Sequence, residues 1–159
     1  MPAIRFADFP EFTPNLSPKE IFARGSFGGT YWRPITSAVT GKKHKNNHVK
    51  YGWDISPHLL TATVYDKSLN KYKTRVGTTL EFWEQKGWIV PRDPYGWVQW
   101  YSEFYNGRRT PDDARQIKRW QGVAGPTGRF KLRLQNMLKK GKDSAKIRQT
   151  LQHWAYKMR

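Results

Sequence analysis

The sequence contains no cysteine, and this absence excludes disulfide bonds, thiolate zinc sites, iron–sulfur clusters and cysteine nucleophiles. It also lacks a long apolar run, since no stretch approaches the roughly 18 apolar residues of a membrane-spanning helix. No apolar segment follows a basic one near the first residue, so we expect no signal peptide. These absences predict an intracellular protein of the nucleus or cytoplasm that does not span a membrane.

Acidic residues are scarce. The 159 residues include 12 Asp and Glu against 29 Lys and Arg, which gives a net charge of +17. A net charge of this size bears on partners rather than on fold, and it favours a polyanion. Candidates are nucleic acid, an anionic membrane surface, and an acidic polysaccharide or protein. Residues 106–159 carry fifteen basic and three acidic side chains, so the C-terminal third supplies most of the positive field.

Aromatic residues are abundant, at 15% of the chain with eight tryptophans. The length fits a single domain, 1–159, and the patterns along it predict a mainly α (α+β) fold. Within this domain we expect an extended N-terminal arm over 1–16, a mixed α/β part over 17–94 and a basic helical part over 95–159. The arm is expected to lie on the surface through four apolar side chains, Ile4, Phe6, Phe9 and Phe12.

Local signals predict where several elements begin. Ser17 and Glu20 have the spacing of a capping box, which predicts a short helix, and Thr78 with Glu81 predicts a second one. In the last part of the chain, four successive helical patterns predict a four-helix unit over 95–157. The first of them repeats aromatic residues at helical spacing, and we assign these to the core: Trp97, Trp100, Tyr101, Phe104 and Tyr105.

The β element is predicted from composition. Residues 30–39 and 61–65 are rich in β-branched and aromatic residues, which is typical of short strands. Pro34 interrupts the first of these segments, and such an interruption favours an edge position. The sequence therefore predicts a small β element in the N-terminal half.

The last helix, with Ser144 as its N-cap, has a polar face made of residue types that contact DNA. Glutamine suits adenine and arginine suits guanine or phosphate, and a helix-turn-helix protein places its second helix in the major groove. We therefore predict nucleic-acid contact by five residues of this face: Lys146, Arg148, Gln149, Gln152 and Lys157. The alternative is an ordinary amphipathic surface helix, because these residue types are also the usual solvent-facing ones.

The loop before the last two predicted helices contains three small residues that predict an anion site: Gly125, Thr127 and Gly128. Backbone amides at a helix start, with Arg129 and Lys131 beside them, favour a phosphate. The glycine spacing differs from that of a Walker A loop. Residues 117–127 resemble the hairpin of helix-hairpin-helix DNA-binding proteins, apart from one inserted residue, Ala124. This resemblance implies that amides at the next helix start hold a phosphate. The alternative is a flexible linker between packed helices.

The basic stretch GKKHKNNHVK raises the question of a metal. His44 and His48 lie four residues apart, a spacing that lets two histidines share a metal on a helix. Lys42, Lys43 and Lys45 surround them and repel cations, so we expect no metal site and no cofactor. The three lysines favour phosphate contact, and a plain solvated loop is the alternative.

Five residues are candidates for acid–base or metal-dependent chemistry: Asp54, His58, Glu81, Glu84 and Asp93. Asp54 and His58 have the spacing of a pair on a helix. Glu84 opens the E-x-K half of a metal-dependent nuclease signature, but the matching Pro111-Asp112 follows it instead of preceding it. These patterns leave open whether the chain is an enzyme.

Two stretches resemble a known family: FTPNLSPKEIFARGSFGGTYWRPI and DPYGWVQWYSEFYNGRRTPDDARQIKRWQGVAGP. They are similar to an uncharacterised family of hypothetical proteins from microbial eukaryotes, and the resemblance extends over most of the chain. No activity is associated with that family, so the resemblance implies no functional residue.

The sequence thus predicts a nucleic-acid-binding protein that prefers duplex DNA, with RNA as the other possible partner. Lys and Arg would neutralise phosphates and release counterions. The expected contacts also include Arg108, Arg109 and Arg133. Two alternatives remain: an enzyme that hydrolyses or modifies nucleic acid through carboxylate and histidine chemistry, and an interaction module for an acidic protein or anionic surface.

Overall fold

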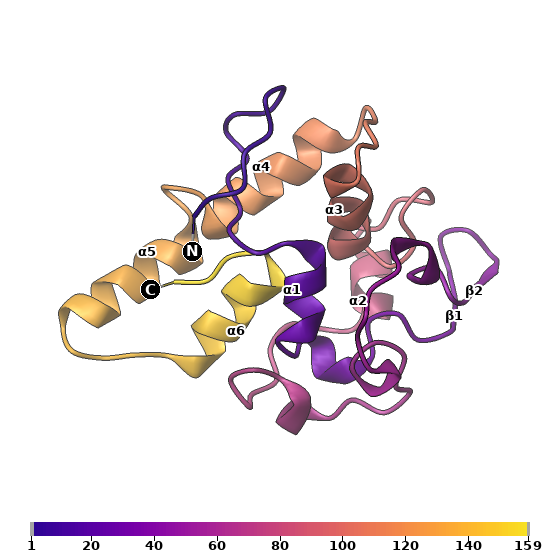
Figure 1. Cartoon of the computed structure of the whole chain (residues 1–159), viewed down its shortest axis with the longest axis horizontal. Helices are drawn as coiled ribbons and strands as arrows, with labels where there is room; N and C mark the ends of the chain where they lie inside the picture. Colours follow the sequence, from indigo (N-terminus) through magenta and orange to yellow (C-terminus); the bar gives the residue numbers. More distant parts are fainter. Residues whose placement is uncertain (1, 159) are drawn as a thin grey trace.

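Helices make up most of the regular structure in residues 2–158, the part of the chain that the computed structural model describes (Figure 1). A two-stranded antiparallel sheet lies in the N-terminal half, where Ile35 pairs with His44. The predicted mainly helical fold, with a small β element and a C-terminal helix cluster, is confirmed. The elements are α1 (Pro18–Ala23), β1 (Ile35–Thr36), β2 (Lys43–His44), α2 (Leu80–Gln85), α3 (Trp97–Tyr105), α4 (Asp113–Ala124), α5 (Arg129–Lys139) and α6 (Ala145–His153). Short 3₁₀ turns at Phe27–Gly29, Val49–Tyr51, Pro57–Leu59 and Lys67–Leu69 connect them.

Helix caps follow the sequence signals closely. The capping box of α1 is present, because the Glu20 amide donates to the Ser17 hydroxyl and the Ser17 amide donates to the Glu20 carboxylate. Ser144 caps α6 as predicted. The N-cap of α2 is Thr79, one residue later than predicted, and its hydroxyl accepts from the Phe82 amide.

The predicted strands are largely wrong. Only two residues of 30–39 belong to a strand, and 61–65 contains none. The two segments do approach each other, since the Trp32 amide donates to Leu60 O at 2.8 Å and the Ala62 amide to Gly29 O at 3.0 Å. Two such bonds do not make a ladder. The chain turns at Phe27–Gly29 and directs Tyr31 and Trp32 into the core, so tertiary packing overrides local β propensity here.

The N-terminal arm does not lie wholly on the surface. Phe12 is completely buried, and the rings of Trp97, Tyr101, Phe104 and Trp120 surround it with centroids 5.1–6.3 Å away. The prediction is therefore wrong for Phe12, while Ile4, Phe6 and Phe9 are half-buried along the surface. Aromatic rings in these edge-on geometries stabilise a core beyond their buried area. The end of the arm, from Phe12 to Leu16, is therefore part of the core.

Helix α3 contributes the largest share of the aromatic core. Four of the five aromatic residues assigned to the core are buried as predicted: Trp97, Trp100, Tyr101 and Phe104. The fifth, Tyr105, is 43% exposed because it lies at the edge of the buried face of the helix. The Trp100 indole donates to the buried Asp113 carboxylate at 2.8 Å. This bond ties α3 to the start of α4 and satisfies the buried indole NH, while the Asp113 carboxylate also accepts from the Thr110 amide and hydroxyl.

The C-terminal helices α4, α5 and α6 pack against one another in sequence. In Figure 1, α5 and α6 lie at one end of the long axis and the β1–β2 hairpin lies at the other. The last residues of the N-terminal arm meet the segment that follows α6, where the Asn15 and Leu16 amides donate to Ala155 O. None of the helices in residues 2–158 combines the length and apolar character that crossing a membrane requires.

Candidate nucleic-acid interface and aromatic cavity

Two residues predicted to read bases are inside the protein. Gln149 and Gln152 of α6 are 0% and 1% exposed, and both side-chain amides donate to Gly25 O, at 3.1 and 2.8 Å. The Gln149 oxygen accepts from the Tyr72 amide, and the Gln152 oxygen accepts from the Arg24 guanidinium. Burial thus corrects their assignment to a nucleic-acid contact. Their role is to satisfy the backbone of a buried turn.

The turn needs glycine at its centre. Gly25 has φ of +97°, and a Cβ there would lie 2.0 Å from Leu69 O. The turn is therefore pressed between α6 and the segment 65–75. One face of α6 makes polar contacts inside the protein, so the helix cannot present that face to a groove of DNA.

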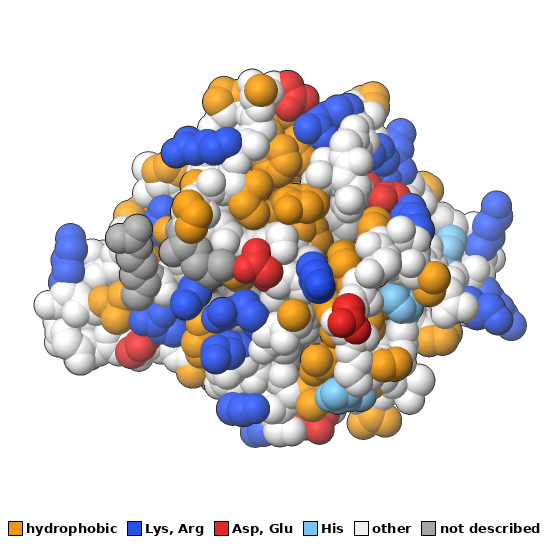
Figure 2. All heavy atoms as spheres, in the orientation of Figure 1, with side chains coloured by type: hydrophobic (Ala, Val, Ile, Leu, Met, Phe, Trp, Pro, Cys, Tyr) orange, Lys and Arg blue, Asp and Glu red, His pale blue; other side chains and the backbone are white. Residues whose placement is uncertain are grey.

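A large positive surface is formed by α5, α6 and the residues around them. Its only acidic residue between 129 and 158 is Asp143, which pairs with Arg148 at 2.7 Å. In Figure 2 several Lys and Arg side chains lie near the end where α5 and α6 lie, and others lie at the opposite end. We call the following eight cations the basic hairpin, and none of them forms an ion pair within residues 2–158: Arg129, Lys131, Arg133, Lys139, Lys140, Lys142, Lys146 and Lys157.

The other predicted arginine contacts are engaged within the protein. Arg108 forms a two-bond pair with Asp93 at 2.8 and 2.7 Å, and Arg109 pairs with Asp8 at 2.7 Å while lying over the Phe104 ring. Arg148 pairs with Asp143 and donates to Met158 O. Their charge still adds to the field, but each guanidinium is already paired with a carboxylate.

The three predicted lysine contacts of the first half are exposed but remote. Lys42, Lys43 and Lys45 lie on and beside β2, at the opposite end of the long axis from α5 (Figure 1). His44 beside them bonds the Thr40 hydroxyl at 2.8 Å. The structure therefore does not join this loop and the basic hairpin into one patch.

The predicted anion loop is more closed than expected. The Gly125 amide donates to Gln121 O, and the Gly128 amide donates to Gly125 O at 2.8 Å, so neither is available to an anion. A Cβ at Gly128 would lie 2.5 Å from the Val123 carbonyl, which explains the glycine, and Thr127 is exposed. Gly128 is the N-cap of α5 and provides no side-chain cap. Amides of the first turn of α5, from Arg129 onward, are the ones that face outward.

The five candidate catalytic residues have separate environments. Asp54 is exposed, the exposed His58 bonds the Ser56 hydroxyl, and Glu84 accepts from the Ala38 amide. Burial raises the pKa of Asp93, and the Arg108 guanidinium opposes this rise by holding both carboxylate oxygens. Within residues 2–158, no hydrogen bond or ion pair joins any two of the five, and no three His, Asp or Glu residues cluster as metal ligands.

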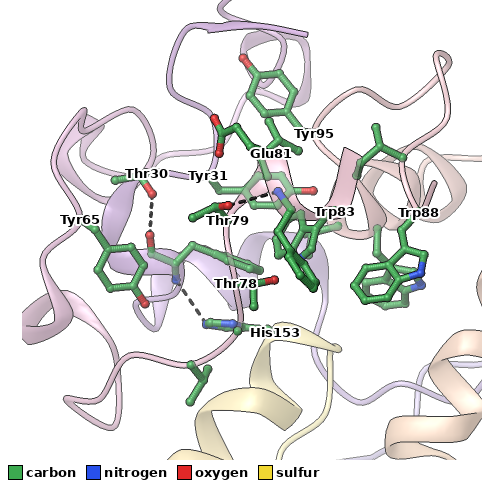
Figure 3. A pocket seen from close by; sticks show the side chains of 18 of the residues that line it. Thr30, Tyr31, Tyr65, Thr78, Thr79, Glu81, Trp83, Trp88, Tyr95 and His153 are labelled. Atoms are coloured by element: carbon green, nitrogen blue, oxygen red, sulfur yellow. Dashed lines mark hydrogen bonds between the residues drawn. The ribbon is translucent and has the colours of Figure 1, made fainter. Parts of the chain in front are cut away.

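The sequence did not reveal a cavity of about 450 Å³ between α2 and the core (Figure 3). Glu81 is the one candidate catalytic residue that lines it. Its walls are mainly aromatic, formed by Tyr31, Tyr65, Trp83, Trp88, Tyr95 and Trp97. These residues come from four separate stretches of the chain, so no local motif could have indicated the site. A volume of this size and an aromatic lining are typical of small-molecule sites.

His153 of α6 lines the cavity and is 7% exposed (Figure 3). Its ring stacks on Phe27 with a centroid distance of 3.9 Å, and its Nε2 accepts from the Phe27 amide at 3.3 Å. A backbone amide can only donate, so Nε2 carries no proton and Nδ1 carries it. Burial lowers the pKa of His153 to about 3, so the ring is neutral at physiological pH.

Acid should destabilise the protein through His153. The folded state keeps the ring neutral down to about pH 3, whereas the unfolded chain takes up a proton below its ordinary pKa of 6.5. The contribution of the neutral His153 ring to the free energy of unfolding is complete above pH 6.5 and is lost as pH falls toward 3. Between pH 6.5 and pH 5 we expect a loss of about 2 kcal/mol from this group.

Urea unfolding at several pH values measures this loss. His153→Gln should flatten the dependence between pH 6.5 and 5, whatever its effect at neutral pH. His58→Gln, which changes an exposed histidine, should keep the wild-type slope. Equal slopes in wild type and His153→Gln would contradict the buried neutral ring.

Comparisons of the chain with protein-family models, with curated proteins and with solved structures find no match. The family resemblance of the two stretches above therefore stays a prediction. The function has to be argued from the basic hairpin and the cavity themselves.

Proposed function

We propose that the protein binds nucleic acid, duplex DNA in preference, through the basic hairpin, in the nucleus or cytoplasm. The observation that carries this proposal is the set of eight cations on and beside the packed helices α5 and α6, none of which forms an ion pair within residues 2–158. Ordinary basic surfaces intersperse both signs of charge. Here the one acidic residue is already paired with Arg148, so the positive field is left for an external anion.

The electrostatic mechanism follows from this geometry. Each cation that neutralises a phosphate releases a counterion, and the logarithm of affinity falls with the logarithm of salt by about 0.9 per contact on duplex DNA. The first-turn amides of α5 add donors and a helix dipole beside Arg129 and Arg133. Binding of this kind positions phosphates and carries little base specificity, which agrees with the burial of Gln149 and Gln152.

Reversing two charges on α5 tests this surface. Arg129→Glu with Arg133→Glu should weaken binding to a duplex and reduce the salt slope by about 2, one unit for each lost contact. Fluorescence anisotropy over a salt series measures both quantities. Both residues are exposed, so the fold should be unaffected, and circular dichroism checks this.

The matched control is Lys42→Glu with Lys43→Glu, which makes the same change in net charge at the opposite end of the molecule. It should weaken binding much less and leave the salt slope close to that of wild type. Equal effects of the two double variants would mean that net charge alone attracts the duplex, and the basic hairpin would lose its assignment.

A further inference from the structure

The cavity in Figure 3 is separate from the basic hairpin, since none of the eight hairpin cations lines it. We propose that it binds a nucleotide, either as a free mononucleotide or as one unstacked nucleotide of a bound strand. The aromatic walls would hold the base and the guanidinium groups at the wall would hold the phosphate. The argument rests on the cavity alone and does not require that the hairpin contacts DNA.

The walls suit a planar ring. In Figure 3, Trp83 and Thr78 lie between Tyr65 at one end of the view and Trp88 at the other. Trp88 is 40% exposed and Trp83 is half-buried, so indole surface remains uncovered. Phe82, which is 36% exposed, also lines the cavity and contacts Trp88, and exposed apolar side chains that adjoin one another mark binding surfaces. Bases of every kind stack on such rings, because each base has a π face.

The charge of the wall suits an anion. Three arginines line the cavity, Arg33, Arg75 and Arg119, against one acidic residue, Glu81. None of the three forms an ion pair within residues 2–158. Guanidinium groups recognise phosphate with two parallel hydrogen bonds, so unpaired arginines at an aromatic cavity favour a phosphate ester over a neutral ring.

Of the three arginines, Arg119 gives the strongest argument for an anionic ligand. It comes from α4, is half-buried, and bonds only a neutral acceptor, the Gln116 amide oxygen at 2.8 Å. Its guanidinium also lies over the Trp154 ring, at 5.4 Å from the centroid. Burial, with Arg115 nearby, lowers the pKa of Arg119, and the charge of Asp112, which pairs with Arg115, opposes this shift only in part. A cation removed from water in this way gains most from an anionic ligand.

Polar groups at the wall could contact the edge of a base. The neutral His153 has Nδ1–H as its free donor, because Nε2 accepts from the Phe27 amide. Thr78 adds a hydroxyl beside it, and the Thr30 hydroxyl is already used on Phe27 O. A few fixed polar groups within an aromatic wall are what gives such a cavity its specificity. Because Nδ1–H of His153 donates, it would pair with a hydrogen-bond acceptor on the ligand.

The test is titration of the full chain with the 5′-monophosphates AMP, GMP, CMP and UMP. Tryptophan fluorescence and calorimetry monitor the binding. The nucleosides and inorganic phosphate are titrated in parallel. At least one nucleotide should bind saturably, its nucleoside about tenfold or more weakly, and phosphate alone more weakly still, since each part supplies only some of the contacts. Absence of saturable binding by all four nucleotides at millimolar concentration would overturn the proposal.

Variants locate the site. Arg119→Gln should weaken nucleotide binding about tenfold or more and leave nucleoside binding unchanged, because it removes only the phosphate contact. The control is Lys118→Gln, which removes one exposed charge from the preceding position of the same helix and should change neither. Equal affinity of the two variants for the nucleotide would place the ligand elsewhere and overturn the proposal.

Binding experiments with DNA duplexes distinguish a free nucleotide from a nucleotide within a bound strand. A duplex containing one bulged nucleotide should bind tighter than the fully paired duplex, and free nucleotide should compete away that excess, if a strand supplies the ligand. Equal affinity for both duplexes, with saturable mononucleotide binding, assigns the cavity to a free nucleotide. The Arg129→Glu, Arg133→Glu variant should weaken duplex binding and keep mononucleotide binding, so failure of the hairpin and failure of the cavity give different results.

Discussion

Replacing Phe12 with alanine should reduce the free energy of unfolding by about 3–5 kcal/mol. Phe12 is fully buried, and six aromatic rings have centroids within 6.3 Å of its own. Removal of its ring leaves a void lined by large rigid side chains, which cannot collapse to fill it. The void therefore adds to the lost hydrophobic burial, and the total effect approaches the upper range for core truncations.

Phe9→Ala is the matched control, because it removes the same ring from the same arm. Phe9 is half-buried and has one aromatic neighbour, Phe104, at 5.6 Å. Its loss should be clearly smaller, on the order of 1 kcal/mol. Chemical unfolding followed by circular dichroism compares the two. Similar losses would mean that the arm only covers the surface, as the sequence pattern suggested.

Breaking the pair of Asp93 and Arg108 should have the second large effect on stability. Asp93 is 1% exposed and Arg108 is 25% exposed at the side chain, and both guanidinium NH groups bond the carboxylate. Asp93→Asn leaves a partly buried guanidinium without its anion. Removal of one partner of a buried pair is much more harmful than replacement of both. Since Arg108 retains some contact with water, we expect the lower part of the usual range, about 3 kcal/mol.

The neighbouring pair provides the control. Arg109 follows Arg108 directly and pairs with Asp8, which is 54% exposed. Asp8→Asn should leave stability almost unchanged, because solvent screens such a pair. The double variant Asp93→Asn, Arg108→Gln should be more stable than the sum of its single variants predicts. Additive losses would mean that the two side chains act independently.

Local features of the sequence predicted the helices well because helix ends are determined by neighbouring residues. Ser17 with Glu20 and Ser144 cap helices within three residues of themselves. The aromatic spacing of α3 likewise identified the buried Trp97 and Trp100. Such signals need no knowledge of the rest of the fold.

Contacts between distant residues explain what could not be predicted. Gln149 and Gln152 have the composition of a surface helix, but their partner, Gly25 O, lies more than 120 residues away in the sequence. The strand predicted over 30–39 forms only at Ile35–Thr36 for a similar reason, since Trp32 is directed into a core built by other segments. The cavity is assembled from distant stretches of the chain and includes Arg119 and His153, whose roles depend on burial that the sequence does not display.

The most direct test of the central claim is fluorescence anisotropy with duplex DNA, single-stranded DNA, duplex RNA and heparin over a salt series. We predict that duplex DNA binds tightest at physiological salt, with a salt slope that corresponds to several phosphate contacts on the basic hairpin. Weak binding that is equal for all four polyanions would contradict the proposal. It would instead support an interaction surface for anionic partners in general.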